Sequence, residues 1–122
     1  MRFIKLNKNP NTNKSGDCVI RALATAFDKN WFKVYEELYL ISVKQARILT
    51  DTEVIREYLQ DYEETVHPAV KGKKRKKVQD LKDDGVYVVR IANHLTTVMD
   101  NRLVDTFDCR TSTVYRSWKV KG

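Results

Sequence analysis

The sequence predicts an α+β protein in which N-terminal helices pack on a C-terminal, largely antiparallel sheet of about four strands. Apolar residues recur at helical spacing between residues 17 and 59, whereas the last third of the chain alternates with a period of two. The length of 122 residues is typical of one domain. We therefore expect a single domain over 1–122, with a polar lead-in over 1–16 and a basic connector over 66–77.

The polar lead-in and the first predicted helix meet at Asp17 and Cys18. The lead-in is rich in Asn and Lys, and a short strand is predicted within it at Arg2–Leu6. Asp17 suits the N-cap position, because its carboxylate can accept hydrogen bonds from the unpaired amides of the first turn. The apolar stripe of this helix consists of Val19, Leu23, Ala26 and Phe27.

Two further helices are predicted before residue 60. Asn30 is the N-cap candidate of the second helix, and the third begins near Thr50 or Asp51. Glu53 stands three residues after Thr50, as a capping box requires. The apolar faces consist of Trp31, Val34, Tyr35, Leu38 and Ile41 in the second helix, and of Val54, Ile55, Tyr58 and Leu59 in the third.

Four strands are predicted after Gly85, and a short helix over Val78–Lys82 precedes them. Asp100 and Asn101 form a tight turn between the second and third strands, so these two strands run antiparallel. Residues whose numbers sum to about 200 then face each other across the pair. The strands are expected over Val86–Ile91, Leu95–Met99, Arg102–Phe107 and Val114–Val120.

The composition excludes several classes of protein. An apolar content of 42%, with 4 glycines and 2 prolines, argues against wholesale disorder and low-complexity chains. No apolar run approaches the ~20 residues of a membrane span, and the first residues lack the apolar core of a secretory signal, so we expect no membrane association. Two cysteines cannot form a disulfide framework, which predicts a cytoplasmic protein in a reducing compartment.

The net charge of +7 is concentrated in one segment. Six basic residues lie within seven positions, and the rest of the chain has a net charge of about +1. A charge run is most often a solvated loop, and no aromatic residue interleaves this one for stacking on single-stranded nucleic acid. The run could bind phosphates, but we rank a nucleic-acid binder third among the possible functions and interpret the run as a surface for an acidic partner. It consists of Lys71, Lys73, Lys74, Arg75, Lys76 and Lys77.

Cys18 is the first candidate for chemistry, because it begins a predicted helix directly after Gly16 and Asp17. Unpaired amides and the helix dipole at that position favour the thiolate, which is the nucleophilic form of cysteine. Asp17 opposes this effect, so the thiolate also needs a positively charged partner. A buried structural cysteine is the alternative interpretation.

His94 is the candidate for that partner. It stands at the junction of two predicted strands, where a turn presents its imidazole. His67 is the only other histidine, and it precedes Pro68 in the polar connector, so we expect it to be exposed to solvent. A single histidine is usually structural, and the case for His94 therefore depends on its neighbours.

A carboxylate beside His94 follows from the predicted strand pairing. The turn places Asp105 opposite Leu95–Thr96, where it could accept the Nδ1–H of His94 and fix its tautomer. Asp108, three residues further on, is the alternative, and both acids could instead cap the turn that follows. The chain thus offers a nucleophile, a base and an orienting group in the order Cys18, His94, Asp105.

Two segments, SGDCVIRALATA and GVYVVRIANHLTTVMDNRLVDTFDCR, resemble the papain-like cysteine peptidase superfamily. The likeness is to its compact branch, which includes bacteriocin-leader peptidases and small phage- or plasmid-encoded papain-like proteins. The resemblance covers Asn11 to about Trp118 and implies a papain-like fold. It further implies Cys18 as nucleophile, His94 as general base and acid, Asp105 as orienting residue, and a location in the cytosol of a bacterium or of a phage host.

The family places an oxyanion-hole side chain, usually Gln, shortly before the nucleophile. No Gln stands there in this chain, and Asn13 is the candidate, with the backbone amide of Cys18 as a second donor. The implied function is hydrolysis of a peptide or isopeptide amide in a protein or peptide substrate, without a cofactor. Transglutaminase-like and arylamine-acetyltransferase enzymes share the Cys–His–Asp order, so acyl transfer and deamidation remain open.

Two alternatives complete the set of expectations. A zinc site of Cys18, Cys109, His94 and an acid would lack the paired CxxC or HxxxH spacing of zinc modules, so no metal is expected and Cys109 is interpreted as a structural thiol. A non-catalytic, phage-encoded host-modifying protein of the same fold would instead dock on its partner through Lys71–Lys77.

Overall fold

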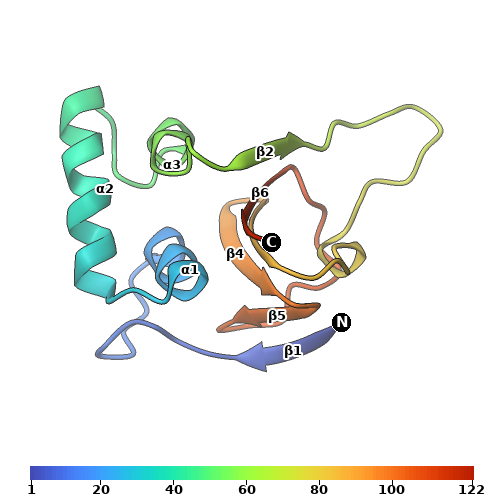
Figure 1. Ribbon diagram of the computed structural model, residues 1–122, viewed down its shortest axis with the longest axis horizontal. Helices are drawn as coiled ribbons and strands as arrows, with labels where there is room; N and C mark the ends of the chain where they lie inside the picture. Colours follow the sequence, from blue (N-terminus) through green and yellow to red (C-terminus); the bar gives the residue numbers. More distant parts are fainter.

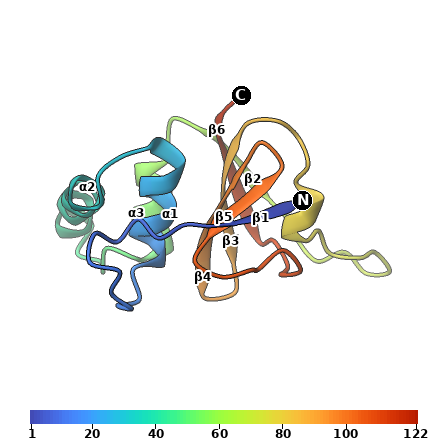
Figure 2. The ribbon, with the colours of Figure 1, turned by 90° about the horizontal axis from the view of Figure 1, so that it is seen from below.

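The computed structural model describes residues 1–122 and has three helices on one face of a six-stranded sheet (Figures 1 and 2). The predicted α+β class is confirmed. The expected number of about four strands is wrong, because one strand precedes the helices and another follows them. The sheet therefore includes segments from both ends of the chain.

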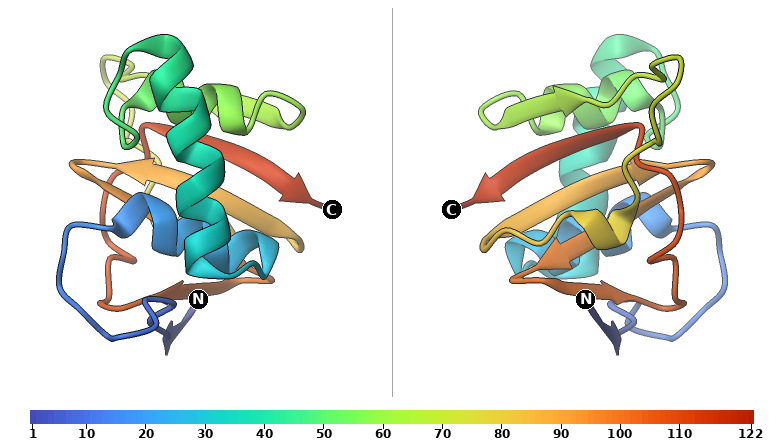
Figure 3. Two further views of the ribbon diagram at one scale, coloured as in Figure 1. Left: turned by 90° about the vertical axis from the view of Figure 1, so that its left-hand side faces the viewer. Right: turned by 90° about the vertical axis from the view of Figure 1, so that its right-hand side faces the viewer.

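The helical layer consists of α1 (Cys18–Phe27), α2 (Trp31–Gln45) and α3 (Thr52–Tyr58). Helix α1 packs directly on the sheet, and the Thr97 hydroxyl donates a hydrogen bond to the Ala22 carbonyl at 2.8 Å. Helix α2 lies outermost and packs against the other two helices (Figure 3). None of the three helices is long and apolar enough to span a membrane.

Side-chain caps fix where the second and third helices begin. Asn30 accepts a hydrogen bond from the Phe32 amide at 2.8 Å, which confirms it as the N-cap of α2. Asp51 accepts one from the Glu53 amide at 2.8 Å and caps α3. The capping box expected from Thr50 is therefore wrong, because the cap is one residue later.

The strands follow the order β1-β5-β4-β3-β6-β2 across the sheet. Every pairing is antiparallel except that of β1 with β5, which is parallel. The strand expected at Arg102–Phe107 ends at Asp105, and the last strand begins two residues later than expected. The bounds are β1 Arg2–Lys5, β2 Glu63–Val66, β3 Val86–Ile91, β4 His94–Met99, β5 Arg102–Asp105 and β6 Arg116–Lys121.

The turn between β4 and β5 sets the register on which the site depends. Asp100 and Asn101 both have positive φ, 48° and 61°, as a two-residue turn of a tight hairpin requires. Thr97 then pairs with Val104 and Val98 with Leu103, a register within one residue of the predicted one.

Both faces of the sheet are covered by apolar side chains. The larger core lies between the helices and the sheet and includes Trp118, which is almost fully buried. The smaller core lies on the other face, beneath the 3₁₀ turn η1 (Val78–Asp80) and the segment before β6. It consists of Val78, Leu81, Val89, Ile91, Val98, Leu103, Cys109 and Val114.

The basic connector runs from β2 to η1 as a loop that extends away from the sheet at the upper right of Figure 1. Its anchor is Arg75, whose guanidinium lies 5.2 Å from the Tyr115 ring centroid and donates to the His67 carbonyl at 3.0 Å. His67 itself is half-buried, with Nε2 2.9 Å from the Ser117 hydroxyl. The expected solvent exposure of His67 is therefore wrong, because β6 supplies a polar partner.

Candidate active site

Three of the four predicted site residues stand at the ends of elements that meet at one edge of the molecule. Cys18 is the first residue of α1, His94 the first of β4 and Asp105 the last of β5. Helix α1 packs on β4, and β4 pairs with β5, so the three ends converge. His94 and Asp105 are each 8% exposed, and Cys18 is half-buried.

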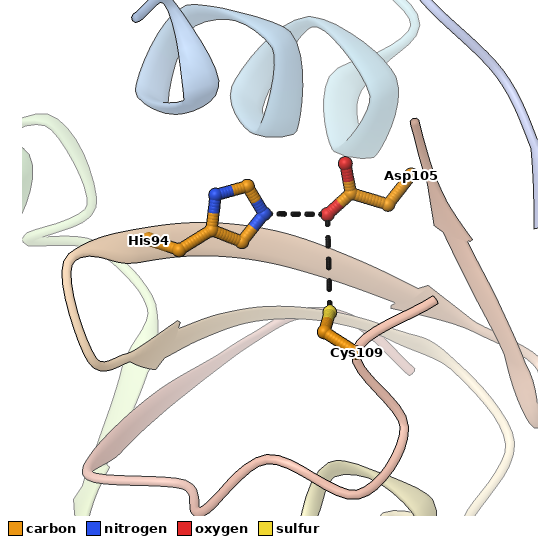
Figure 4. A group of neighbouring side chains, drawn as sticks. All are labelled: His94, Asp105 and Cys109. Carbon is orange, nitrogen blue, oxygen red and sulfur yellow. Dashed lines mark hydrogen bonds and ion pairs between the residues drawn. The ribbon is translucent and has the colours of Figure 1, made fainter. Parts of the chain in front are cut away.

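His94 and Asp105 form a short hydrogen bond, with Nε2 2.6 Å from Oδ2 (Figure 4). The predicted contact is present, but the expected ring nitrogen, Nδ1, is wrong. The register places Asp105 next to Thr96, two residues further along β4 than His94. The imidazole therefore reaches diagonally along the strand with its distal nitrogen. Nδ1 remains for the Cys18 thiol.

Asp105 is held by hydrogen-bond donors on both of its oxygens. The Thr96 hydroxyl donates to Oδ2 and the Thr106 amide donates to Oδ1, each at 2.6 Å. Burial alone would raise the pKa of Asp105, but these bonds and the contact with His94 outweigh it and hold the pKa below its usual value. Asp105 is therefore a carboxylate at neutral pH.

The electrostatics of Cys18 and His94 favour a thiolate beside an imidazolium. Burial opposes ionisation of Cys18, but the nearby His94 imidazole, the Leu95 amide and the charge of Arg21 outweigh it and lower the thiol pKa. Burial likewise opposes the charged form of His94, yet the hydrogen bonds and charges of Asp105 and Cys18 raise its pKa to about 9. Each partner thus stabilises the ionised form of the other.

Asp17 occupies the N-cap position of α1, but the expected side-chain cap is absent. Its buried carboxylate instead accepts hydrogen bonds from Asn9 Nδ2 and Trp31 Nε1, each at 2.9 Å, and Arg21 Nε lies 2.9 Å away as an ion pair. Asn9 and Trp31, from outside the helix, and the Arg21 guanidinium together draw the carboxylate away from the first amides. The first amides of α1 therefore have no side-chain cap.

Two residues that sequence reasoning missed hold this loop in place. Asn9 is 6% exposed and accepts hydrogen bonds from the Asn11 and Asn13 amides at 3.0 and 3.3 Å. Arg21 connects the start of α1 to the end of β5, because Nη1 donates to the Thr106 hydroxyl at 2.8 Å. The signals in the sequence were the turn-forming asparagines around Pro10 and the i,i+4 spacing of Asp17 and Arg21.

A cleft of about 710 Å³ opens in front of Cys18 and His94. Asn13 is exposed on its wall, as is Asn93, whose φ of 53° turns the chain from β3 into β4. The ring centroid of Phe107 lies 4.8 Å from that of His94, so this half-exposed phenyl group covers the imidazole. Cys18 and His94 thus both line the cleft, and the Phe107 ring shields the imidazole.

Asp108 lies apart from this group, whereas Cys109 is next to Asp105. Asp108 is exposed and pairs with Arg110, with Oδ2 2.8 Å from Nη2, so the alternative orienting role for Asp108 is wrong. Cys109 is buried, with Sγ 4.0 Å from Asp105 Oδ2. Its burial, together with nearby carboxylates, raises its pKa to about 11.

The donor atoms of His94, Asp105 and Cys109 lie within 4.8 Å of one another and are the one group that could hold a metal ion (Figure 4). Binding would require the thiol of Cys109 to ionise against its raised pKa. It would also break the 2.6 Å hydrogen bond between His94 and Asp105.

No protein-family model, no curated protein and no solved structure matches the chain. The resemblance to papain-like peptidases therefore stays a prediction, which depends on the motifs of the sequence. The candidate site depends on the geometry described above.

Proposed function

We propose that this protein is a papain-like cysteine hydrolase that cleaves a peptide or isopeptide amide, with Cys18 as its nucleophile. The observation that carries the proposal is the convergence of Cys18, His94 and Asp105 beside a cleft, with His94 hydrogen-bonded to Asp105 and lowering the pKa of Cys18. A thiol with a lowered pKa, beside a histidine with a raised one, is the arrangement that nucleophilic catalysis requires.

Acylation begins when the Cys18 thiolate attacks the substrate carbonyl carbon and forms a C–S bond. The carbonyl electrons move to oxygen, where the uncapped Cys18 amide and the Asn13 side chain are the proposed hydrogen-bond donors. The His94 imidazolium donates its Nδ1 proton to the leaving nitrogen. The C–N bond then breaks, the amine departs, and a thioester with Cys18 remains.

Deacylation reverses the roles of the same groups. His94, now neutral, accepts a proton from water, and the resulting hydroxide attacks the thioester carbonyl. The C–S bond breaks, the carboxylic acid product leaves, and the thiolate–imidazolium pair is restored. Asp105 keeps Nε2 protonated throughout, so Nδ1 is always the nitrogen that exchanges the proton.

The experiment that tests this proposal measures the rate at which iodoacetamide alkylates Cys18 as a function of pH. We expect rapid modification well below the free-thiol pKa of ~8.5 and loss of that advantage in His94→Ala. The buried thiol of Cys109 is the internal control, because its raised pKa keeps it unreactive. Equal, slow modification of both cysteines would refute the proposal.

A non-catalytic binding protein is the second candidate, and the exposed connector favours it. Lys71, Lys73, Lys74 and Lys76 are all exposed there and take part in no ion pair. Such a surface attracts an acidic partner by electrostatic steering. An unreactive Cys18, together with salt-sensitive binding to an acidic protein, would favour this candidate over the hydrolase.

Acyl transfer and deamidation use the same thioester and differ in the acceptor or in the amide that is attacked. Adding a primary amine to a turnover assay separates transfer from hydrolysis, because a transferase yields the amide product.

The two free thiols fit the reducing cytosol that we propose as the location.

A further inference from the structure

The walls of the cleft differ from those of an apolar specificity pocket. Of 14 lining residues only Cys18 and Phe107 are apolar, and the others, apart from Gly16, carry polar or charged side chains. Ligand pockets are more often lined by hydrophobic and aromatic side chains. Recognition in this cleft therefore depends on polar and charged groups of the substrate.

The charges on these walls are mostly positive. The cations are Lys5, Lys14 and Arg21, and the single lining acid is Asp17. Asp17 is 5% exposed and forms an ion pair with Arg21, so these two charges offset each other. The two lysines remain exposed on the walls.

Lys5 and Lys14 come from two different segments that line the cleft. Lys5 ends β1 and is paired in register with Asp105 on β5, and Lys14 lies in the loop four residues before Cys18. Neither lysine forms an ion pair within the protein. Their two charges exceed the single net negative charge of the ionised Cys18, His94 and Asp105, so the cleft is positive even with the thiolate present.

We propose that the cleft selects acidic substrates, in which Asp or Glu side chains flank the scissile amide and pair with Lys5 and Lys14. This inference rests on the proposed function, because it names the substrate class of the same site. The lysines would increase the rate of encounter with a negatively charged segment and hold it in the groove beside the thiol. They are specificity residues and take no part in the proton transfers.

The test uses two small alkylating reagents of similar size, anionic iodoacetate and neutral iodoacetamide. The Cys18 thiolate displaces iodide from both reagents. The intrinsic reactivity of the thiol therefore cancels in the ratio of the two rates, and the ratio reports the electrostatic potential near the sulfur. At about 10 mM salt we expect Lys5→Gln/Lys14→Gln to lower the iodoacetate-to-iodoacetamide ratio severalfold, since the Debye length is then about 30 Å and charges that line the same cleft as the thiol are little screened.

The matched control is Lys82→Gln/Lys121→Gln, which removes the same charge. Both lysines are exposed, and the register pairs Lys121 with Val86, at the end of β3 opposite to His94. We expect this control to leave the ratio unchanged. An unchanged ratio in the Lys5→Gln/Lys14→Gln variant, or an equal fall in both variants, would overturn the proposal.

Two acetylated peptide chloromethyl ketones extend the test to a substrate-like segment, one with two Glu residues before the warhead and one with two Gln residues. The Glu peptide should inactivate the wild-type protein faster, and the preference should vanish in Lys5→Gln/Lys14→Gln. Equal rates in the wild type would count against acidic selectivity. Slow reaction of Cys18 with every reagent, at the rate of a free thiol, would instead refute the hydrolase itself.

Discussion

Replacement of Asp105 by Asn isolates the carboxylate that holds His94. The substitution preserves volume but cannot preserve the hydrogen bonds, because Asp105 accepts from His94 and Thr96 on one oxygen and from the Thr106 amide on the other. An Asn amide oxygen can occupy only one of these positions. With the oxygen toward Thr106, the NH₂ group faces Nε2 and forces a neutral imidazole that accepts there.

The size of the effect follows from the pKa of His94. The carboxylate helps to raise that pKa from an ordinary 6.5 to about 9. A full return would remove about 3 kcal/mol of stabilisation from the imidazolium, at 1.36 kcal/mol per pKa unit. Because the thiol of Cys18 also supports the imidazolium, we expect the thiolate population at pH 6–7 to fall by between about tenfold and a hundredfold.

The assay is the pH profile of Cys18 alkylation by iodoacetamide, followed by mass spectrometry, with circular dichroism as the check on folding. The matched control is Asp108→Asn. Asp108 lies three residues after Asp105, and its replacement removes the same charge from an exposed ion pair with Arg110. We expect the control profile to follow the wild type within about twofold. Superimposable profiles of Asp105→Asn and wild type would refute the reasoning, and a larger loss in Asp108→Asn would move the role to that residue.

Three further predictions concern stability. In Cys18→Ser, the free energy of unfolding should decrease as pH rises above 6.5, because Asp105 still raises the pKa of His94 in the folded state. The decrease should vanish in Cys18→Ser/His94→Gln, and urea titrations at each pH would show it. Arg21→Gln leaves the buried carboxylate of Asp17 without its ion pair and should cost about 2–3 kcal/mol in urea denaturation, whereas a wild-type midpoint would show that the pair contributes little. Replacing the exposed connector residues Lys73, Lys74 and Lys76 with serine should shift the melting temperature by less than about 2 °C. A larger fall would show that these lysines make stabilising contacts.

Local sequence patterns determined much of the fold. Helix α2 begins after Asn30 and strand β3 covers Val86–Ile91, both as predicted, since each depends on a cap or a periodicity within a few residues. The turn at Asp100–Asn101 determined the pairing of β4 with β5 in the same way. Because a hairpin register is fixed by its turn, the sequence alone brought Asp105 next to His94.

Tertiary structure decided what depends on partners far apart in the chain. The strand predicted at Arg2–Leu6 is present as β1, but its parallel pairing with β5 was not predicted, and the short polar strand β2 is defined only by its pairing with β6. Asp17 was expected to cap its own helix, but Asn9 and Trp31, eight and fourteen residues away, provide its hydrogen bonds instead. Local patterns carry no information about such contacts, because their geometry exists only after the helices have packed on the sheet.

At the candidate site, too, some features were predictable from the sequence and others depended on tertiary packing. The sequence identified Cys18, His94 and Asp105 by residue type and by their places at element ends. The packed structure decided that Nε2, and not Nδ1, faces Asp105, and that Arg21 joins the start of α1 to the end of β5. It also placed Lys5 and Lys14 on the walls of one cleft. Lys5 reaches the site because β1, near the N-terminus, pairs with β5, about 100 residues later in the chain.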